Sequence, residues 1–385
     1  MQENSFVCSN CGNSNLRYIG YLNGEPYCRA CIKFKRVSMR IDKPNNKNPN
    51  RGNYQLSYPL SKEQDAISLN VLSNYKKGIN TLIFAICGAG KTELVYRVIS
   101  YTLSIGGVVA FAIPRRDVVI EIHERLKETF KKAKVVAVYG GNTSDLTGDI
   151  VCLTTHQLFR YPHYFDLLIV DEIDAFPYRG DPVLESLLLK SVKKNFIMMS
   201  ATPSDSVLNH FSHPGCDILR LNTRFHRHPL PVPKVFIKPR ILKMYFTIKK
   251  LKVYLKQKKP VFLFVPTIEI GEKIAPLILR LVPGGNFVHS KKVDRAKIIS
   301  DFKEKRYKYL ITTAVLERGV TVKDLQVIIY QADHDIYDEH ALVQISGRVG
   351  RKIDAPSGEV IFVADKETEA IRKCILQIKT ANTYL

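Results

Sequence analysis

The sequence predicts two α/β domains in tandem, each built on a parallel β-sheet, after a small cysteine module. Three observations lead to this expectation. The chain has 385 residues, and at about 150 residues per domain this length suits two or three domains. Short, continuously apolar runs alternate with stretches whose apolar residues recur at helical spacing, the pattern of buried parallel strands joined by helices. Two Cys-x-x-Cys pairs precede the first such run.

Each α/β domain has its own series of apolar runs, which we interpret as strands. The first series comprises Thr81–Cys87, Gly107–Ile113, Lys134–Tyr139, Asp149–Thr155, Leu167–Val170 and Phe196–Met199. The second series comprises Val261–Val265, Phe287–His289, Tyr309–Thr312, Val327–Tyr330 and Val360–Val363. Helical spacing of apolar residues appears between the runs, for example from Leu94 to Leu103. We therefore expect repeated strand-helix-strand units.

Two polar or proline-rich stretches divide the chain. The basic, Pro- and Asn-rich stretch from Asp42 to Asn53 is expected to be a linker, and a second break runs from His228 to Lys234. These breaks predict a cysteine module with its linker at residues 1–52, a first α/β domain at 53–230 and a second at 231–385.

The composition narrows the possible functions. Lys and Arg total 58 against 36 Asp and Glu, which gives a formal net charge of +22, while 45% hydrophobic and 24% charged residues are ordinary for a folded protein. Such a surplus predicts a polyanionic partner, because surface cations gain most by neutralising phosphates and releasing their counterions. The polar start lacks the build of a signal peptide, and no run approaches about 18 apolar residues. We therefore expect a cytoplasmic protein.

The four N-terminal cysteines form two pairs, Cys8 with Cys11 and Cys28 with Cys31, separated by sixteen residues. Four thiolates at this spacing are typical of a structural, tetrahedral zinc site, and in a reducing compartment the pairs favour metal over disulfides. A redox dithiol is the alternative, but nothing around these cysteines resembles a thioredoxin βαβ context. Because so short a module buries little core, we expect zinc to hold its fold.

A glycine-rich loop follows the first apolar run, with the sequence Cys87-Gly88-Ala89-Gly90-Lys91-Thr92. Glycines let backbone N–H groups close around phosphate oxygens, the lysine reaches the β- and γ-phosphates, and the hydroxyl holds Mg²⁺. We therefore predict that Gly88, Ala89, Gly90, Lys91 and Thr92 bind ATP, with Thr92 as a magnesium ligand.

An acidic pair, Asp171 and Glu172, follows the apolar run Leu167–Val170. Carboxylates at the end of a buried strand, downstream of a phosphate loop, suit phosphoryl transfer better than a chance exposed turn. We expect Asp171 to hold Mg²⁺ and Glu172 to polarise the attacking water.

With these motifs the chain resembles the superfamily 2 nucleic-acid-dependent ATPases of the DEAD/DEAH helicase type. The phosphate loop of that family has the pattern A-x-x-G-x-G-K-T, and Ala85 matches its first position. The other motifs that carry the resemblance are Leu60-Ser61-Lys62-Glu63-Gln64, Pro114-Arg115-Arg116, Thr154-Thr155-His156-Gln157, Ser200-Ala201-Thr202-Pro203, Thr312 to Val320 and Gln344 to Arg351. The resemblance implies two RecA-like domains.

The same resemblance implies roles for single residues. Gln64 resembles the adenine-reading glutamine, and Gly319 is assigned to the nucleotide. Gln344 would orient the water or sense the phosphate. Arg348 and Arg351 would act as arginine fingers, reaching the γ-phosphate from the second domain when the two domains close on ATP.

The positive charge is concentrated in one part of the chain. Thirteen Lys or Arg residues and no acid lie between Ile218 and Ile268, and Arg with Phe or Tyr suits sequence-independent binding of a single strand. The predicted contacts to nucleic acid are Arg115, Arg116, Thr154, Thr155, Arg224, Arg227 and Thr312.

A four-cysteine module directly ahead of a compact helicase core, with the strings PRRDVVIEI, TTHQLFRY, NTRFHRHPLPVPK and QISGRVGR, resembles the late-competence ComFA family. The resemblance covers nearly the whole chain. It implies a cytosolic ATPase, peripheral to the inner face of the membrane and not inserted, that pulls incoming single-stranded DNA through the uptake channel during transformation. It also implies the ComEC channel, the phosphoribosyltransferase-like ComFC and the recombination mediator DprA as partners.

Two other functions stay open from the sequence. A PriA-like replication-restart or repair helicase also combines cysteine metal sites with this motor, but it needs larger accessory domains. A non-motor zinc-ribbon factor that binds nucleic acid is the second, and the intact Lys91, Asp171, Glu172, Arg348 and Arg351 argue against it.

Overall fold

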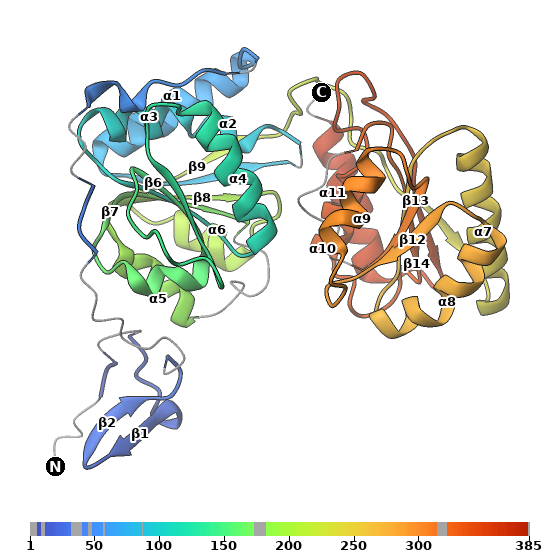
Figure 1. The fold of residues 1–385 in the computed structure, drawn as a ribbon, viewed down its shortest axis with the longest axis horizontal. Helices are drawn as coiled ribbons and strands as arrows, with labels where there is room; N and C mark the ends of the chain where they lie inside the picture. Colours follow the sequence, from blue (N-terminus) through green and yellow to red (C-terminus); the bar gives the residue numbers. More distant parts are fainter. Residues whose placement is uncertain are drawn as a thin grey trace. The chain divides into compact units, whose positions relative to one another are not determined.

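The structure is a computed structural model of the chain. It describes residues 6–8, 12–31, 41–44, 48–56, 58–86, 88–172, 182–313 and 322–383. By their contacts these residues form two compact units, one of residues 1–85 with 90–221 and the other of residues 86–89 with 222–385 (Figure 1). Two α/β units in tandem confirm the predicted fold class.

The first unit is built on a seven-stranded sheet with the order β5-β6-β4-β7-β8-β3-β9. Every strand pair in it is parallel. The strands are β3 (Asn80–Ala85), β4 (Val109–Ile113), β5 (Val135–Val138), β6 (Ile150–Thr154), β7 (Phe165–Asp171), β8 (Val192–Ser200) and β9 (Cys216–Leu221).

Helices cover both faces of this sheet, with α1 and α3 on one face and α5 and α6 on the other (Figure 1). Both faces are therefore buried, which explains the continuously apolar runs of the central strands. The helices are α1 (Lys62–Lys77), α2 (Lys91–Leu94), α3 (Tyr96–Ser104), α4 (Arg116–Thr129), α5 (Pro182–Ser191) and α6 (Asp205–Phe211), with the short 3₁₀ turns η2 (Pro49–Gly52) and η3 (Thr155–Arg160).

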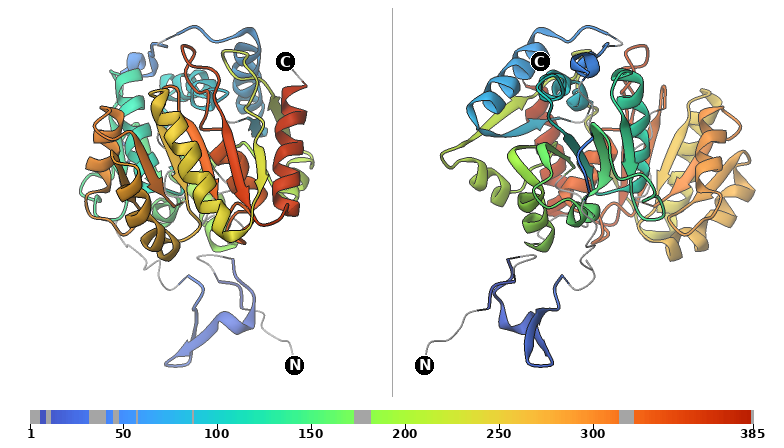
Figure 2. Two further views of the ribbon diagram at one scale, coloured as in Figure 1. Left: turned by 90° about the vertical axis from the view of Figure 1, so that its right-hand side faces the viewer. Right: turned by 60° about the vertical axis from the view of Figure 1, so that its left-hand side comes forward.

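The second unit has a six-stranded parallel sheet with the order β10-β15-β14-β11-β13-β12. Its strands are β10 (Lys234–Ile237), β11 (Val261–Phe264), β12 (Gly285–Val288), β13 (Tyr309–Thr312), β14 (Gln326–Tyr330) and β15 (Val360–Ala364). Its helices are α7 (Arg240–Lys256), α8 (Ile268–Leu281), α9 (Arg295–Lys303), α10 (Glu339–Ser346) and α11 (Glu369–Asn382). Figure 2 shows α7 lying across the strands of this sheet.

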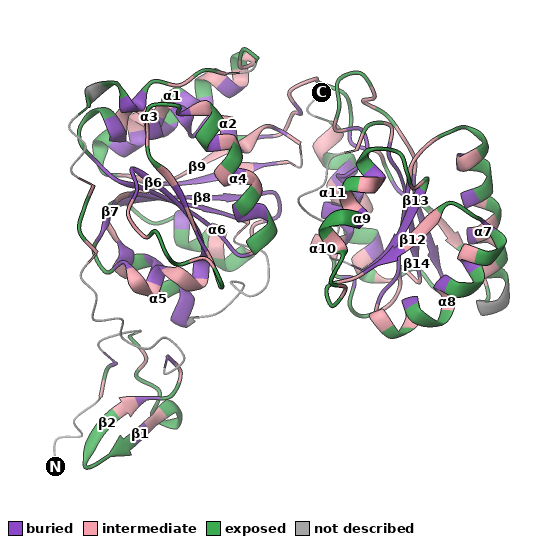
Figure 3. Cartoon of the chain, viewed as in Figure 1, coloured by how far each residue is buried: buried purple, intermediate pink, exposed green. Residues whose placement is uncertain are grey.

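Alternate residues of one strand serve two different cores in the second unit. Phe262 and Phe264 of β11 pack with α9, α10 and α11, whereas Val261 and Leu263 pack with α7 and α8. Successive side chains of a strand point to opposite faces, so a strand covered on both sides must be apolar at every position. Figure 3 shows the same contrast, with buried strands inside and exposed residues on the outer faces of the helices.

Two edge strands, β9 and β10, are absent from the predicted series. The residues of β9 are mostly half-buried, and β10 begins and ends with exposed residues. Because an edge strand is only partly covered, it lacks the continuous apolar run by which we predicted the others.

The contact boundary between the units lies after Leu221, ahead of the predicted boundary after residue 230. Leu230 already belongs to the core of the second unit. Its backbone exchanges two hydrogen bonds with the side-chain amide of Asn382 in α11.

Part of the predicted linker is fixed to the first unit. Arg51 in η2 is 2% exposed, and its guanidinium donates to the carboxylate of Asp149 (2.6 Å) and to the carbonyls of Leu103 (2.9 Å) and Gly107 (3.3 Å). The body of the first unit therefore includes the turn ahead of residue 53.

The cysteine module contains the 3₁₀ turn η1 (Leu16–Tyr18) and an antiparallel hairpin of β1 (Ile19–Leu22) and β2 (Glu25–Cys28). Asn23 and Gly24 form its turn with positive φ values of 50° and 82°, as a tight two-residue hairpin requires. The hairpin places Cys28 at the end of β2, opposite Ile19.

Candidate active site

The predicted phosphate loop lies at the carboxyl end of β3, just before α2. Gly88 and Gly90 have φ values of +82° and +76°, which glycine adopts without steric cost. A Cβ atom at Gly90 would lie 2.6 Å from Nε2 of Gln64. A side chain at Gly90 would therefore displace Gln64, the predicted adenine-reading residue. Cys87 lies outside the described residues.

Gln64 is fixed by the first turn of α1. Its backbone N–H donates to the Ser61 hydroxyl (3.2 Å), and its Oε1 accepts from the Ser61 backbone N–H (2.9 Å). This reciprocal pair is a capping box. With a side chain only 1% exposed, Gln64 lies against the phosphate loop in a fixed orientation.

Three strands bring the candidate catalytic residues to one edge of the sheet. The order β7-β8-β3 places Asp171 at the end of β7, Ser200 at the end of β8 and the phosphate loop after β3. Asp171 is level with Met199, and Met199 with Ile83. Since neighbouring strands lie about 4.8 Å apart, the backbone of Asp171 is about 10 Å from that of β3. A magnesium-nucleotide fits a span of this size.

Glu172 is held in a backbone conformation that is rare for its residue type. Its φ is +59°, and its N–H donates both to the Asp171 carboxylate (2.9 Å) and to the Met199 carbonyl (3.1 Å). A non-glycine residue in this region costs about 1–3 kcal/mol, and such strain concentrates at functional sites. This strained position directly follows β7 and the buried Asp171.

Thr92 has a neighbour that the sequence did not reveal. Thr92 is 7% exposed, and Nη1 of Arg125 in α4 lies 3.5 Å from its hydroxyl and 3.8 Å from the Glu93 carboxylate. Arg125 also pairs with Glu121, four residues earlier. In the sequence Arg125 is one of many charged helix residues, so only the fold identifies it as a support for the phosphate loop.

In the second unit Gln344, Arg348 and Arg351 lie together at the end of α10. Gln344 and Arg348 are 6% and 2% exposed, and Arg351 is half-buried, with its Nε donating to the Gly347 carbonyl (2.9 Å). The structure therefore places these residues in the last turn of α10 and the segment directly after it. Gly319 lies outside the described residues, and the arginine-finger role stays a prediction.

Arg224 supports this turn from inside the second unit. It is 1% exposed, and its guanidinium donates to the carbonyls of Gly347 (3.3 Å), Val349 (3.0 Å) and Gly350 (2.8 Å). We had predicted a contact to nucleic acid for Arg224. In the structure its donors are used within the protein, and three bonds to one turn are the geometry of a positioning residue.

His226 contacts the same turn in its neutral form. Its Nε2 lies 3.0 Å from the Gly350 carbonyl, and its Nδ1 accepts from the His228 backbone N–H (3.1 Å). A neutral ring with the proton on Nε2 satisfies both bonds. Partial burial, followed by the nearby Arg224 and His228, holds the pKa of His226 below its ordinary value against the opposing effect of the Gly350 carbonyl.

The other predicted contacts to nucleic acid differ in exposure. Arg116 and Arg227 are exposed and Arg115 is half-buried. Arg116 lies over the ring of Tyr139, 4.8 Å from its centroid. The buried members of the set are Thr154, Thr155, Arg224 and Thr312. The exposed arginines are thus the side chains best placed to meet a phosphate backbone.

Basic residues of the acid-free stretch from Ile218 to Ile268 form ion pairs with acidic residues elsewhere in the chain. Lys243 is fully buried and pairs with Asp365, and Lys234 pairs with Glu359. Partners distant in sequence therefore neutralise part of the charge that appears unopposed in the sequence.

Three of the four predicted zinc ligands lie together. The sulfur atoms of Cys8, Cys28 and Cys31 are buried and within 4.8 Å of one another. Those of Cys8 and Cys31 are 3.6 Å apart, close to the separation of about 3.8 Å that two thiolates have on one tetrahedral zinc. Asn13 Nδ2 lies 3.6 Å from the Cys28 sulfur, the kind of outer hydrogen bond that supports a thiolate ligand. These residues fit zinc; Cys11 lies outside the described residues.

Comparison with known proteins agrees with this geometry. Residues 64–211 match the DEAD/DEAH box helicase family, and residues 246–352 match the helicase conserved C-terminal domain. Yeast (S. cerevisiae) Dbp5 bound to RNA and ADP BeF3 has a similar fold, with a TM-score of 0.62 and 16% identity, covering 85% of this chain and 92% of that one. Both α/β units are thus RecA-like domains. Among the described residues, no helix is long and apolar enough to cross a membrane.

Two curated relatives cover nearly the whole chain. The competence protein ComFA of Bacillus subtilis (strain 168) is 34% identical over 99% of this chain and 87% of its own length. ComFA of Streptococcus pneumoniae (strain ATCC BAA-255 / R6) is 34% identical over 99% of this chain and 91% of its own length. With identity of this extent and an ATP-hydrolysing helicase-type core, the chain belongs to the ComFA family of competence proteins.

Proposed function

We propose that this protein is a motor that uses ATP to move along single-stranded DNA and draws it into the cell during transformation. The observation that carries the proposal is the catalytic edge of the first sheet, where Lys91, Thr92, Asp171 and Glu172 follow two strands separated only by β8. The extended match to two ComFA proteins supports the biological setting.

Each candidate catalytic residue of the first unit has its own proposed role in ATP hydrolysis. Lys91 neutralises charge on the β- and γ-phosphates, and Glu172 accepts the proton of the attacking water. Thr92 and Asp171 would hold Mg²⁺, which supplies charge neutralisation between the β- and γ-phosphates when bound. Arg125 keeps the Thr92 hydroxyl in place. The expected rate loss on removing any of these groups is large, because they act as one unit.

In the second unit, the turn after α10 carries the arginines proposed to act in ATP hydrolysis. Arg348 and Arg351 are proposed to stabilise the negative charge that develops at the γ-phosphate, and Arg224 and His226 fix the carbonyls of the turn that carries them. Stabilisation of this kind by an arginine contributes about 10³–10⁵ in rate in related phosphoryl-transfer enzymes. Loss of the γ-phosphate on hydrolysis would release this interaction and so couple ATP to movement.

The strand itself is proposed to lie along exposed arginines, with no reading of base sequence. Arg116 and Arg227, together with the half-buried Arg115, supply contacts to phosphates, and the net charge of +22 favours the approach of a polyanion. By the family relationship we propose ComEC, ComFC and DprA as partners, cytoplasmic action at the membrane surface, and zinc in the cysteine module.

The test is ATPase activity measured in parallel with single-stranded DNA, duplex DNA and RNA. We expect single-stranded DNA to stimulate most, and Lys91→Ala and Glu172→Gln to lose hydrolysis while retaining binding to DNA. Lys77→Ala, an exposed lysine at the end of α1, is the matched control and should behave as wild type. Equal stimulation by RNA, or wild-type turnover in Glu172→Gln, would contradict the proposal.

A further inference from the structure

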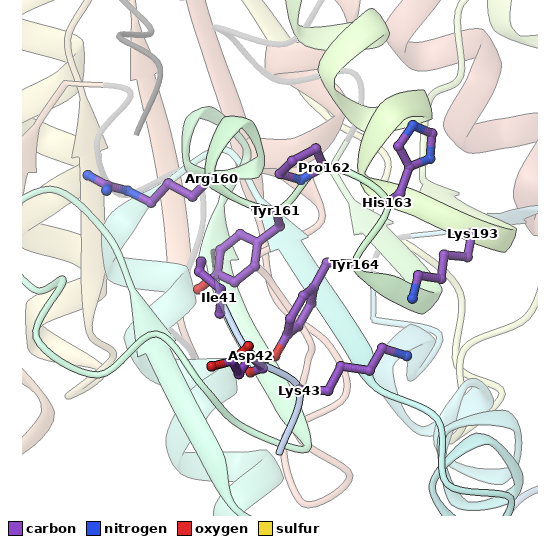
Figure 4. A pocket seen from close by; sticks show the side chains of 9 residues that line it. All are labelled: Ile41, Asp42, Lys43, Arg160, Tyr161, Pro162, His163, Tyr164 and Lys193. Carbon is purple, nitrogen blue, oxygen red and sulfur yellow. Dashed lines mark hydrogen bonds between the residues drawn. The ribbon is translucent and has the colours of Figure 1, made fainter. Parts of the chain in front are cut away.

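A pocket lies in the first unit, away from the phosphate loop. It has a volume of about 520 Å³ and is lined by Ile41, Asp42, Lys43, Arg160, Tyr161, Pro162, His163, Tyr164 and Lys193 (Figure 4). Its residues come from the segment that follows the cysteine module, from the end of η3 and its connection to β7, and from the start of β8. The volume is in the range of small-molecule binding sites.

The pocket lies at the amino edge of the sheet, whereas the candidate active site lies at the carboxyl edge. Pro162, His163 and Tyr164 immediately precede β7, and Asp171 is its last residue. Seven residues of strand at about 3.3 Å each separate the pocket from Asp171 by about 20 Å. No part of the catalytic edge described above lines the pocket, so the proposed ATPase chemistry does not account for it.

The walls of the pocket are held by hydrogen bonds from two buried tyrosines. The hydroxyl of Tyr164 donates to the Asp42 carbonyl (3.1 Å), and that of Tyr161 donates to the Leu146 carbonyl (2.9 Å). The rings of Tyr161 and Tyr164 lie 5.3 Å apart between their centroids and are 0% and 6% exposed, respectively. They therefore form a rigid floor, and the segment at Asp42 is fixed against it.

The polar lining is predominantly positive. Lys43, Arg160 and Lys193 line the pocket together with a single carboxylate, Asp42. In Figure 4 the amines of Lys43 and Lys193 point toward the same region, while the Arg160 guanidinium points away to the other side. This lining attracts an anion.

The carboxylate of Asp166 lies next to the pocket and is hydrogen-bonded to one of its lining lysines. Asp166 accepts from Lys43 Nζ (2.7 Å) and from the Val108 backbone N–H (2.9 Å). Lys193 lies close enough to this pair that its pKa is lowered, first by partial burial and then by the charge of Lys43, while Asp166 acts in the opposite direction. The ammonium groups of Lys43 and Lys193 thus lie close to each other, and a phosphate placed between them would relieve their repulsion.

We propose that this pocket binds a phosphate of the single-stranded DNA on which the motor acts. The inference rests on the proposed function. Two lysine ammonium groups, Lys43 and Lys193, directed to one region of a cavity suit a phosphodiester, and the pocket wall at Ile41–Lys43 belongs to the segment that leads from the cysteine module. A strand held here would therefore contact the protein beside that segment, at a point remote from ATP.

The test compares two neighbouring lysines of β8. Lys193 lines the pocket, and Lys194 is exposed like Lys193 but does not line it, because successive strand residues point to opposite faces. Lys193→Glu should weaken binding of an oligothymidylate about five- to tenfold and reduce the slope of log affinity against log salt by about 0.7. Lys194→Glu, which makes the same change in charge, should weaken it less than about twofold.

Further measurements separate the possible failures. Lys43→Gln, which keeps a polar side chain and removes the charge, should weaken DNA binding in the same direction as Lys193→Glu. Basal ATPase without DNA and thermal melting should be unchanged in both variants.

If Lys193→Glu and Lys194→Glu behave alike while wild type binds DNA, the pocket assignment is wrong and the motor function stands. If wild type neither binds single-stranded DNA nor is stimulated by it, the motor function itself fails. If Lys193→Glu lowers binding to phosphatidylglycerol vesicles but not to DNA, the pocket binds lipid phosphate and our inference is overturned.

Discussion

Replacement of Arg51 by alanine is expected to destabilise the first unit strongly, although Arg51 lies in a stretch that the sequence presents as a linker. Arg51 and Asp149 have side chains that are 2% and 0% exposed, and their charged atoms are 2.6 Å apart. The other oxygen of Asp149 accepts from the Lys134 backbone N–H (2.8 Å). Arg51→Ala would leave this carboxylate buried without its cation, and would remove one hydrogen bond from each of the carbonyls of Leu103 and Gly107.

The expected size of the effect follows from this burial. Removing one partner of a buried ion pair costs about 3–5 kcal/mol. In a unit of about 200 residues, 1 kcal/mol corresponds to about 2–4 °C in melting temperature, so the shift should be about 6–20 °C. Arg97→Ala is the matched control, since Arg97 and Asp65 form a pair of the same unit at 2.8 Å with side chains 29% and 47% exposed. Such an exposed pair contributes about 0–1 kcal/mol.

The assay is thermal unfolding of the full chain followed by circular dichroism, with hydrogen exchange of the amides around β6 to assign the loss to the first unit. Arg51→Lys keeps the charge but not the planar fork of donors, so it should fall between wild type and Arg51→Ala. Equal melting temperatures for Arg51→Ala and Arg97→Ala would refute the reasoning, because burial would then have no effect on the energy of the pair.

Three further predictions concern the site and the module. Arg125→Ala should lower ATP turnover about tenfold and raise the Mg²⁺ concentration needed for half-maximal rate, because the Thr92 hydroxyl loses its neighbour; an unchanged Mg²⁺ dependence would contradict this role. Chelation of zinc should unfold the cysteine module and weaken DNA binding more than basal ATPase, and equal loss of both would make the module a folding element of the core. His226 has a pKa below its ordinary 6.5, so the unfolded chain takes up a proton first as pH falls; stability of the second unit should therefore decrease below about pH 6.5, and the slope should be smaller in His226→Gln.

Strands buried on both faces were predictable because burial dictates their residue types. Residues 261–264 and 360–364 are apolar or small throughout, since one side of each strand packs on α7 and α8 and the other on α9 to α11. Edge strands β9 and β10 are covered only in part. Their mixed composition matched neither the strand nor the helix pattern, so neighbours in space, and not local sequence, determine them.

The phosphate loop, the acidic pair and the cysteine pairs were also predictable, because each is a local arrangement whose chemistry requires fixed residue types at fixed spacing. The roles of Arg224 and Arg125 were not. Arg224 contacts a turn more than a hundred residues away, and Arg125 meets Thr92 across the space between two helices. Nothing in the residues around either arginine distinguishes it from an arginine that faces solvent.

The sequence by itself determined the two α/β domains, the order of the motifs and the ATPase chemistry, because burial and phosphate binding act through short segments of chain. Only the tertiary structure decided which charges oppose one another. It paired Lys243 with Asp365 and Arg51 with Asp149, and it gathered Lys43, Arg160 and Lys193 around one pocket. The physical reason is that Coulomb interactions and desolvation depend on distance and burial in space, and separation along the chain fixes neither.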